Sequence, residues 1–203
     1  MKSLSEIETV SKRSSRAAGF SWGVAEEVGK NIRILEMFGI SGIKNLNYYF
    51  RVKAKTKFEK LNLISNENKI RKIEFCPIYA GISFLDQVRS LENFSEIKFE
   101  KIAYPLLFLP FVSRASEIIG KKLQLKIDNR IFLLNHNISL YSNSLENGVV
   151  EIGNNILIKF QENEDSFEEN EWKEIYKLSE NTFVDENDSL KEGGAGAGLT
   201  DND

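Results

Sequence analysis

The sequence predicts an α+β protein in which an N-terminal helical hairpin packs with a mainly antiparallel sheet, followed by a flexible glycine-rich acidic tail. Apolar residues recur at helical spacing over residues 4–35, and short β-rich runs separated by turn residues fill residues 121–160. Residues 179–203 show no apolar period. We expect a single globular domain over residues 1–178, which comprises a helical region (1–50), a sheet region (70–160) and a short helix (170–178), and then a tail over residues 179–203.

Two helix-start signals define the hairpin. Ser3 and Glu6 have the spacing of a capping box, and the helix that follows is expected to run to Gly19 with an apolar face that includes Val10. Ser21 is a typical cap for a second helix, which we expect to end at Gly39 and its left-handed turn. The second helix carries an apolar stripe at helical spacing, formed by Ala25, Val28, Ile32 and Leu35. The two helices should therefore pack together.

The middle of the chain gives a mixed signal. Residues 40–60 fit a helix that frays into a strand or a loop, because helical apolar spacing gives way to alternating lysines. Residues 65–68 have the composition of a turn. Beyond the turn, apolar patterning and prolines predict a strand over 70–75, a short helix over 78–91, a strand over 97–104 and a helix over 111–119 ended by Gly120.

Hairpin patterns dominate the C-terminal half. Two β-rich runs flank the turn Asp128-Asn129, and two more flank Gly153-Asn154-Asn155. The patterns predict strands over 121–127, 130–135, 149–152 and 156–160. Trp172, Ile175 and Tyr176 then have the spacing of one last amphipathic helix.

Composition limits the kinds of function. Hydrophobic residues make up 41% of the 203 residues and charged residues 28%, the balance of an ordinary globular protein. A single cysteine, Cys76, and a single histidine, His136, exclude internal disulfides, zinc sites built from Cys and His clusters, and iron–sulfur cages. The N-terminus lacks the apolar core of a signal peptide, and the longest apolar run, Leu106–Val112, is interrupted by Pro110. We expect a cytoplasmic protein that makes no contact with membranes.

The charge is unevenly distributed. Residues 161–203 hold 14 acidic and 3 basic groups, whereas the whole chain holds 30 and 27, so residues 1–160 carry 16 acidic and 24 basic groups. The body therefore has a net charge of +8, and the C-terminal segment has a net charge of −11. An acidic tail on a basic body is usually a solvated extension, and the alternative is that it folds back over an anion site.

The start of the second helix is one candidate anion-binding site. A helix N-terminus presents free backbone N–H groups, and Ser21, Trp22 and Glu26 lie there, with Arg16 just before. The competing interpretation is purely structural: Ser21 caps the helix, Gly23 permits close helix packing and Trp22 belongs to the core. This structural interpretation is favoured, because caps are far commoner than ligand sites.

Two further candidates lie elsewhere in the chain. Arg114, at the start of the helix after Pro110, suggests a second anion site, with capping again as the alternative. Cys76 before Pro77 is either a nucleophile or, more commonly, a small buried apolar residue. His136 is expected to be exposed in a polar turn.

The C-terminal segment is the most unusual in composition. Its glycines, Gly196 and Gly198 among them, allow a close backbone approach to a ligand, although neither a phosphate-loop lysine nor a flanking strand and helix is present. The side chains of Asp201, Asn202 and Asp203 offer oxygen ligands to a hard cation, although the spacing of an EF-hand is absent. Composition alone predicts a flexible tail.

The two ends of the chain together resemble a known family. The segments Arg16–Glu27 and Gly194–Asp203 are similar to those of the bacterial domain-of-unknown-function family 3726, as are Cys76-Pro77-Ile78 and Pro105–Phe111. The resemblance implies a small stand-alone bacterial protein of nearly this length, and no activity, cofactor or catalytic residue follows from it. It also implies that the tail docks into a cleft or a partner, with residues 185–191 more acidic than expected of the family.

Three functions are weighed. The first is a small-molecule metabolic enzyme or enzyme subunit that acts on an anionic substrate held by Arg16 or Arg114, with the tail near the site. The second is a noncatalytic accessory protein whose tail docks into a partner enzyme. Nucleic-acid binding ranks third, because the pI is about 5.5 and a recognition-helix pattern is missing, despite Lys53, Lys55, Lys57 and Lys60. No cofactor can be assigned.

Overall fold

The N-terminal helices begin and end where the sequence predicts. The computed structural model describes residues 2–135, 139–144, 148–162 and 164–182, and its first helices are α1 (Leu4–Ala17) and α2 (Trp22–Met37). The Ser3 hydroxyl accepts a hydrogen bond from the Glu6 amide at 3.1 Å, and Ser21 caps α2 in the same way. The second helix ends before Gly39, whose φ is +70°.

The packed face of α1 differs from the predicted one. Val10 is 54% exposed, whereas Ser11 and Ser15 are buried in the contact with α2. Small side chains allow the two helices to approach closely: a Cβ added to Gly29 of α2 would lie 2.8 Å from the Glu8 carbonyl oxygen of α1. Close approach through small residues, rather than an apolar stripe, therefore joins this pair.

A long irregular segment connects the N-terminal helices to the sheet. After α3 (Gly42–Lys53) the chain has no helix until α4 (Pro77–Leu91), and its only ladder strand in between, within these described residues, is β1 (Glu67–Asn68). The strand predicted over 70–75 is wrong: of that segment only Phe75 pairs, in isolated bridges to Glu59 and Ile102. These bridges fix the irregular segment beside the start of α4.

The main sheet has six strands in the order β1-β2-β8-β4-β5-β6. Its remaining strands are β2 (Glu96–Phe99), β4 (Lys122–Ile127), β5 (Arg130–Asn135), β6 (Ser139–Ser142) and β8 (Ile156–Gln161). Only β1 and β2 pair in parallel, so the mainly antiparallel sheet is confirmed. The hairpin β4–β5 about Asp128-Asn129 is confirmed as well.

The second predicted hairpin is wrong. The strand β7 (Ile152–Gly153) pairs with β3 (Ile102–Ala103) in a separate two-stranded sheet, whereas β8 lies between β2 and β4. The predicted strand over 97–104 is accordingly split into β2 and β3. Local hairpin spacing around Gly153 gives way here to the larger apolar contact that β8 makes at the centre of the sheet.

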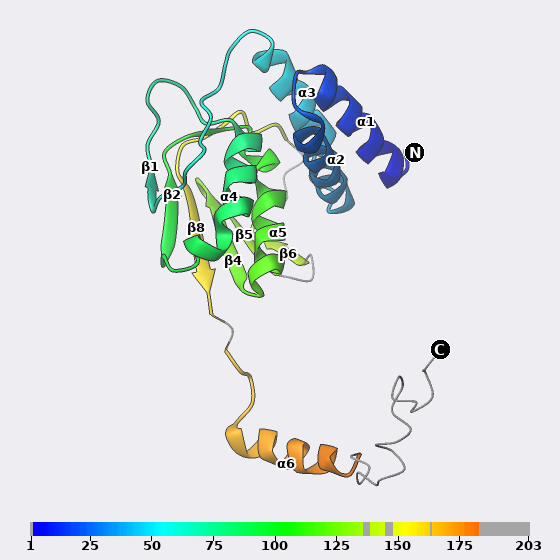
Figure 1. Cartoon of the computed structure of the whole chain (residues 1–203), viewed down its shortest axis with the longest axis vertical. Helices are drawn as coiled ribbons and strands as arrows, with labels where there is room; N and C mark the ends of the chain where they lie inside the picture. The colour runs from blue at the N-terminus through cyan, green and yellow to red at the C-terminus, as the bar shows by residue number, and fades with distance from the viewer. Residues whose placement is uncertain (1, 136–138, 145–147, 163, 183–203) are drawn as a thin grey trace, which may run out of the picture. The chain divides into compact units, whose positions relative to one another are not determined.

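One face of the main sheet is covered by helices. Figure 1 shows α4 and α5 (Leu109–Ile119) lying along the sheet, with α1, α2 and α3 beside them. Side chains alternate accordingly: Ile97, Leu125 and Ile158 are buried under the helices, whereas Lys126 and Lys159 are exposed on the other face. The short helix η1 (Pro105–Leu107) leads into α5.

The chain divides into two compact units, Met1–Asn163 and Glu164–Asp203. Within the described residues of the second unit lies the predicted last helix, α6 (Glu169–Glu180), at whose start the Glu168 amide donates to the Glu171 carboxylate at 2.8 Å. Among the described residues, no helix combines the length and the apolar character that crossing a membrane would require.

Candidate functional site

The turn between α1 and α2 brings Arg16 and Trp22 together. The Arg16 guanidinium donates to the Phe20 carbonyl oxygen at 3.0 Å and lies 5.6 Å from the centroid of the Trp22 ring. Trp22 is 58% exposed, so its predicted place in the core is wrong. Arg16, in the last turn of α1, thus binds a carbonyl of the turn that connects α1 to α2.

Ser21 and Glu26 have partners within the protein. The Ser21 hydroxyl accepts a hydrogen bond from the Val24 amide at 3.4 Å, which satisfies one of the free donors at the start of α2. The Glu26 carboxylate is paired with Lys30 and Lys12, and hydrogen bonds from these two lysines, in that order, lower its pKa. Open space surrounds Gly23, which therefore makes no close helix contact. Of the structural interpretation, the Ser21 cap is therefore confirmed, whereas the core position of Trp22 and the close packing at Gly23 are wrong.

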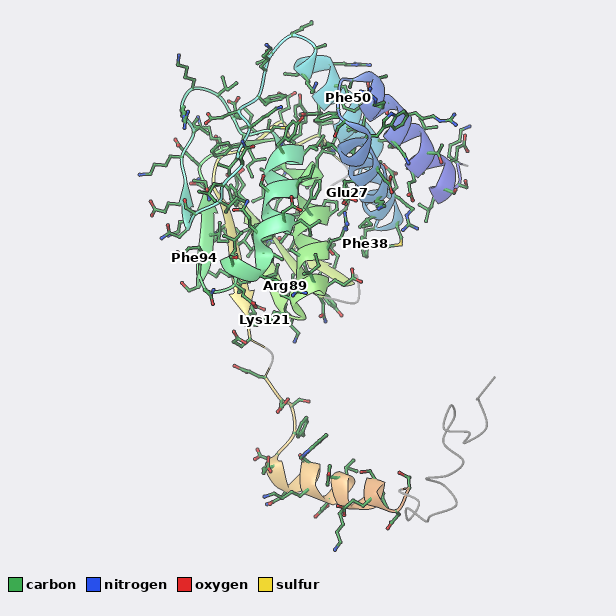
Figure 2. All side chains as sticks on the ribbon, in the orientation of Figure 1. Glu27, Phe38, Phe50, Arg89, Phe94 and Lys121 are labelled. Atoms are coloured by element: carbon green, nitrogen blue, oxygen red, sulfur yellow. The ribbon has the colours of Figure 1, made fainter. Side chains whose placement is uncertain are left out.

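Arg114 forms an ion pair with Glu27 in the second turn of α2. Figure 2 labels Glu27 on the side of α2 that faces α5, the helix that carries Arg114. Both side chains are about three-quarters buried. The ion pair of Arg114 with Glu27 thus joins α5 to α2. Arg114 therefore does not form one anion site with Arg16 at the start of α2.

The remaining predicted site residues lie outside the described residues. These are Gly196, Gly198, Asp201, Asn202 and Asp203, together with His136. The roles predicted for them stay predictions.

A pocket of about 490 Å³ opens where α3, the segment after it and the start of α4 meet. The last turns of α3 supply Tyr49 and Lys53, and the start of α4 supplies Cys76 and Tyr79. The rest of the lining comes from Gly19, Thr56, Lys57, Phe58 and Lys60. We call it the lysine pocket, since three of its nine lining residues are lysines and none is acidic.

The three lysines lack carboxylate partners. Among the described residues, no Asp or Glu oxygen lies within ion-pair distance of Lys53, Lys57 or Lys60. Lys53 instead donates to the Ala18 carbonyl oxygen at 2.7 Å, and Lys60 lies 4.2 Å from the centroid of the Tyr79 ring. By contrast, Lys12, Lys30 and Lys121 elsewhere on the surface all have acidic partners. The pocket is therefore a place of uncompensated positive charge.

Apart from Lys53, the inner wall of the pocket is aromatic and uncharged. The Tyr49 hydroxyl and the Cys76 sulfur are 3.0 Å apart and buried, and the Tyr49 ring stacks on Phe58 at a centroid distance of 5.3 Å. Burial raises the pKa of the Cys76 thiol, against the opposing influence of Tyr49 and of the Lys53 charge. Burial raises the pKa of Tyr49 too. Both groups are therefore protonated at neutral pH, and Cys76 is the small buried residue that the sequence favours over a nucleophile.

A cavity of about 460 Å³ on the sheet is a weaker candidate. It lies across β1, β2, β8 and β4, and its lining includes Glu67 and Glu100 as well as three lysines. Lys69 and Lys98 have acidic neighbours there, because Lys69 lies 3.9 Å from Glu67 and Lys98 pairs with Glu96. Since its charges are nearly balanced, this cavity gives no comparable preference for an anion.

The sequence contains a signal for the lysine pocket that helix-start reasoning passes over. Lys53, Lys57 and Lys60 recur at intervals of four and three residues, next to the aromatic residues Tyr49 and Phe58. The spacing does not predict how the irregular segment 54–66 folds, and this fold places the lysines near the start of α4.

A match to a known family covers the N-terminal segment of the chain. The model of the family described as "Protein of unknown function (DUF3726)" matches residues 2–76, so the resemblance is confirmed over that segment. Its continuation through Pro105–Phe111 and the C-terminal segment stays a prediction. Every residue that lines the lysine pocket except Tyr79 lies within the match. No curated protein and no solved structure matches the chain.

Proposed function

We propose that this protein binds an anionic small molecule with an apolar or aromatic body in the lysine pocket. The observation that carries the proposal is the convergence of three lysines without carboxylate partners on one pocket that has aromatic walls. Small-molecule sites typically combine an apolar lining with a few charged groups that fix the ligand's orientation, in hollows of about 300–1,000 Å³. The volume of about 490 Å³ is in this range.

The three lysines have different roles in this proposal. Lys53 is half-buried and its ammonium group already binds the end of α1, so it contributes charge from the inner wall. Lys57 and Lys60 are exposed at the rim, where they are free to move onto a ligand. Phe58 and Tyr79, both half-buried, present apolar surface to the body of the ligand.

The chemistry of the pocket favours binding over covalent catalysis. A nucleophilic cysteine requires a depressed pKa and access to the substrate, whereas the pKa of Cys76 is raised and its side chain is 3% exposed. The proposal is therefore compatible with an enzyme subunit that binds its substrate or an effector here, and it makes no use of the C-terminal tail.

The test compares two variants by isothermal titration against inorganic phosphate, organic acids and phosphorylated metabolites. Lys57→Gln/Lys60→Gln should weaken the binding of every anion that the wild-type protein binds, by about tenfold, since each lost charge contact contributes roughly 0.5–1 kcal/mol. Lys55→Gln is the control: Lys55 lies in the same basic segment, is exposed, and does not line the pocket.

Equal affinities for the wild type and the Lys57→Gln/Lys60→Gln variant would refute the proposal, as would a Lys55→Gln variant that loses as much. Thermal unfolding of both variants checks that the fold is intact. Because all three side chains are exposed and none has a carboxylate partner among the described residues, their unfolding temperatures should stay near that of the wild type.

A further inference from the structure

A second hollow borders the lysine pocket along the irregular segment. Its volume is about 720 Å³, and it shares Lys57, Phe58 and Lys60 with the pocket. Beyond this common wall it is lined by three further cationic residues, Lys69, Arg71 and Lys72, and by a single carboxylate, Glu59. We call it the outer groove. Cationic side chains thus line both hollows, and Lys57 and Lys60 belong to both.

Glu59 holds the two sides of the outer groove together. Its carboxylate accepts a hydrogen bond from the Arg71 backbone amide at 2.9 Å, and the Arg71 side chain lies 3.9 Å from it. The Glu59 amide donates in turn to the Glu74 carbonyl oxygen at 3.0 Å. Glu59, the one acidic residue among the described lining residues, therefore ties Arg71 to the segment that carries Lys57 and Lys60, and the cationic residues of the lining outnumber it.

We infer that the ligand of the lysine pocket carries a chain of two or more phosphate groups, which runs from the pocket into the outer groove. The inference rests on the proposed function and gives its ligand a chemical class. A monocarboxylate or a single phosphate would engage only the cations of the pocket. The outer groove offers further cations, and both lysine ammonium and arginine guanidinium groups bind phosphate oxygens, so a ligand with several phosphate groups would engage the cations of both hollows.

Two classes of ligand carry such a chain of phosphate groups, namely nucleoside di- or triphosphates and inorganic oligophosphates. The aromatic wall formed by Phe58 and Tyr79 gives a ring-bearing ligand additional contact area, whereas an inorganic chain would use the cations alone. The test therefore includes both sources, with inorganic phosphate as the single-charge reference.

The experiment is isothermal titration of the full chain at fixed ionic strength with inorganic phosphate, inorganic triphosphate and adenosine triphosphate. Both triphosphates should bind at least about tenfold more tightly than inorganic phosphate, because they reach cations in both hollows. Arg71→Gln/Lys72→Gln should weaken triphosphate binding about fivefold and leave the affinity for inorganic phosphate unchanged. The control Arg51→Gln/Lys55→Gln removes the same two residue types from the end of α3 and the segment just after it, outside both hollows, and should change neither affinity.

The outcomes distinguish a failure of the inference from a failure of the proposed function. Similar affinities for phosphate and triphosphate, or an Arg71→Gln/Lys72→Gln variant that binds triphosphate normally, would overturn the inference, while a loss of phosphate binding in Lys57→Gln/Lys60→Gln would still support the proposed function. If none of the three anions binds, the inference is overturned, and the titrations with organic acids then decide the proposed function. Tighter binding of a single-stranded oligonucleotide than of adenosine triphosphate would make the ligand a polymer and also overturn the inference.

Discussion

Asn31 presents an unusual buried amide whose replacement should stabilise the protein. Its side chain is 2% exposed, and neither the amide nitrogen nor the carbonyl oxygen has a hydrogen-bond partner among the described residues. It lies beside a cavity of about 10 Å³ whose other lining residues are all apolar, namely Val28, Ile32, Leu46, Ile78, Leu107 and Phe111. The perturbation is Asn31→Leu.

The magnitude follows from the loss of an unsatisfied polar group. Leaving a buried donor or acceptor without a partner costs about 1–3 kcal/mol, and leucine has the branched shape of asparagine, with the adjacent cavity taking up part of its larger volume. Asn31→Leu should therefore raise the free energy of unfolding by about 1–3 kcal/mol. In a protein of this size, each kcal/mol raises the unfolding temperature by about 2–4 °C.

Asn45 provides the matched control. It is the same residue type and fully buried, but its amide donates to the carbonyl oxygens of Ser41 and Gly148, and its oxygen accepts from the Val150 amide. Asn45→Leu should lower the free energy of unfolding by about 2–4 kcal/mol, because it orphans these backbone groups. Urea unfolding should give a higher free energy of unfolding than that of the wild type for Asn31→Leu and a lower one for Asn45→Leu. If Asn31→Leu were destabilising, the reasoning would fail, and a bound water satisfying the amide would be the next explanation, since a cavity of this size is near the limit for one water molecule.

Three further predictions concern packing, an ion pair and pH. Gly81→Ala should destabilise the protein by about 2 kcal/mol or more in urea unfolding, because its Cβ would overlap the Phe111 ring where α4 crosses α5. A double-mutant cycle with Glu27→Gln and Arg114→Gln should give a coupling energy of about 1 kcal/mol, discounted for the partial exposure of both side chains. Burial raises the pKa of Cys76 in the folded state, so the contribution of this thiol to stability is complete below the pKa of the unfolded thiol and is lost as pH rises through the folded pKa. The free energy of unfolding, measured at pH values from about 8 to 10, should therefore decline, and Cys76→Ala should reduce this decline.

Each of these has a clear contrary result. Gly23→Ala is the control for Gly81, since open space surrounds Gly23, and equal effects of the two alanines would contradict the packing argument. Additive effects in the Glu27 and Arg114 cycle would show that the ion pair contributes nothing. A thiol-specific reagent that modifies Cys76 in the folded protein at a pH of about 8 would contradict its burial.

Helices and the local hairpin were predictable because their signals are local. Caps at Ser3 and Ser21 and the left-handed Gly39 are decided within one turn of chain, and so is the turn at Asp128-Asn129. The packed face of α1 was mispredicted because apolar periodicity places Val10 inside, whereas the contact is decided by how closely α2 can approach at Gly29. The partners of the strands are nonlocal, and the spacing about Gly153 carries no information on them.

The site was less predictable than the fold. Arg16 and Arg114 were chosen as free cations, but each has a partner, a carbonyl in one case and Glu27 in the other, that the sequence does not reveal. Lys57 and Lys60 stand out only once the irregular segment is placed beside the start of α4, since their distinguishing feature is that they line one pocket with Lys53 and form no ion pair within the described residues. Unpaired charge is a property of three-dimensional surroundings, and local sequence spacing cannot supply it.

The position of β8 has a consequence for how the chain acquires its structure during synthesis. This strand is the last in the first unit and yet lies between β2 and β4, which no ladder joins directly. Until Ile156–Gln161 has left the ribosome, the edges of β2 and β4 that pair with β8 have no partner strand, and their backbone N–H and C=O groups stay unpaired. The sheet therefore stays divided until its last strand emerges, exposed to chaperones and to aggregation, and a nonsense mutation anywhere between β5 and Ile156 leaves two incomplete halves rather than a shortened domain.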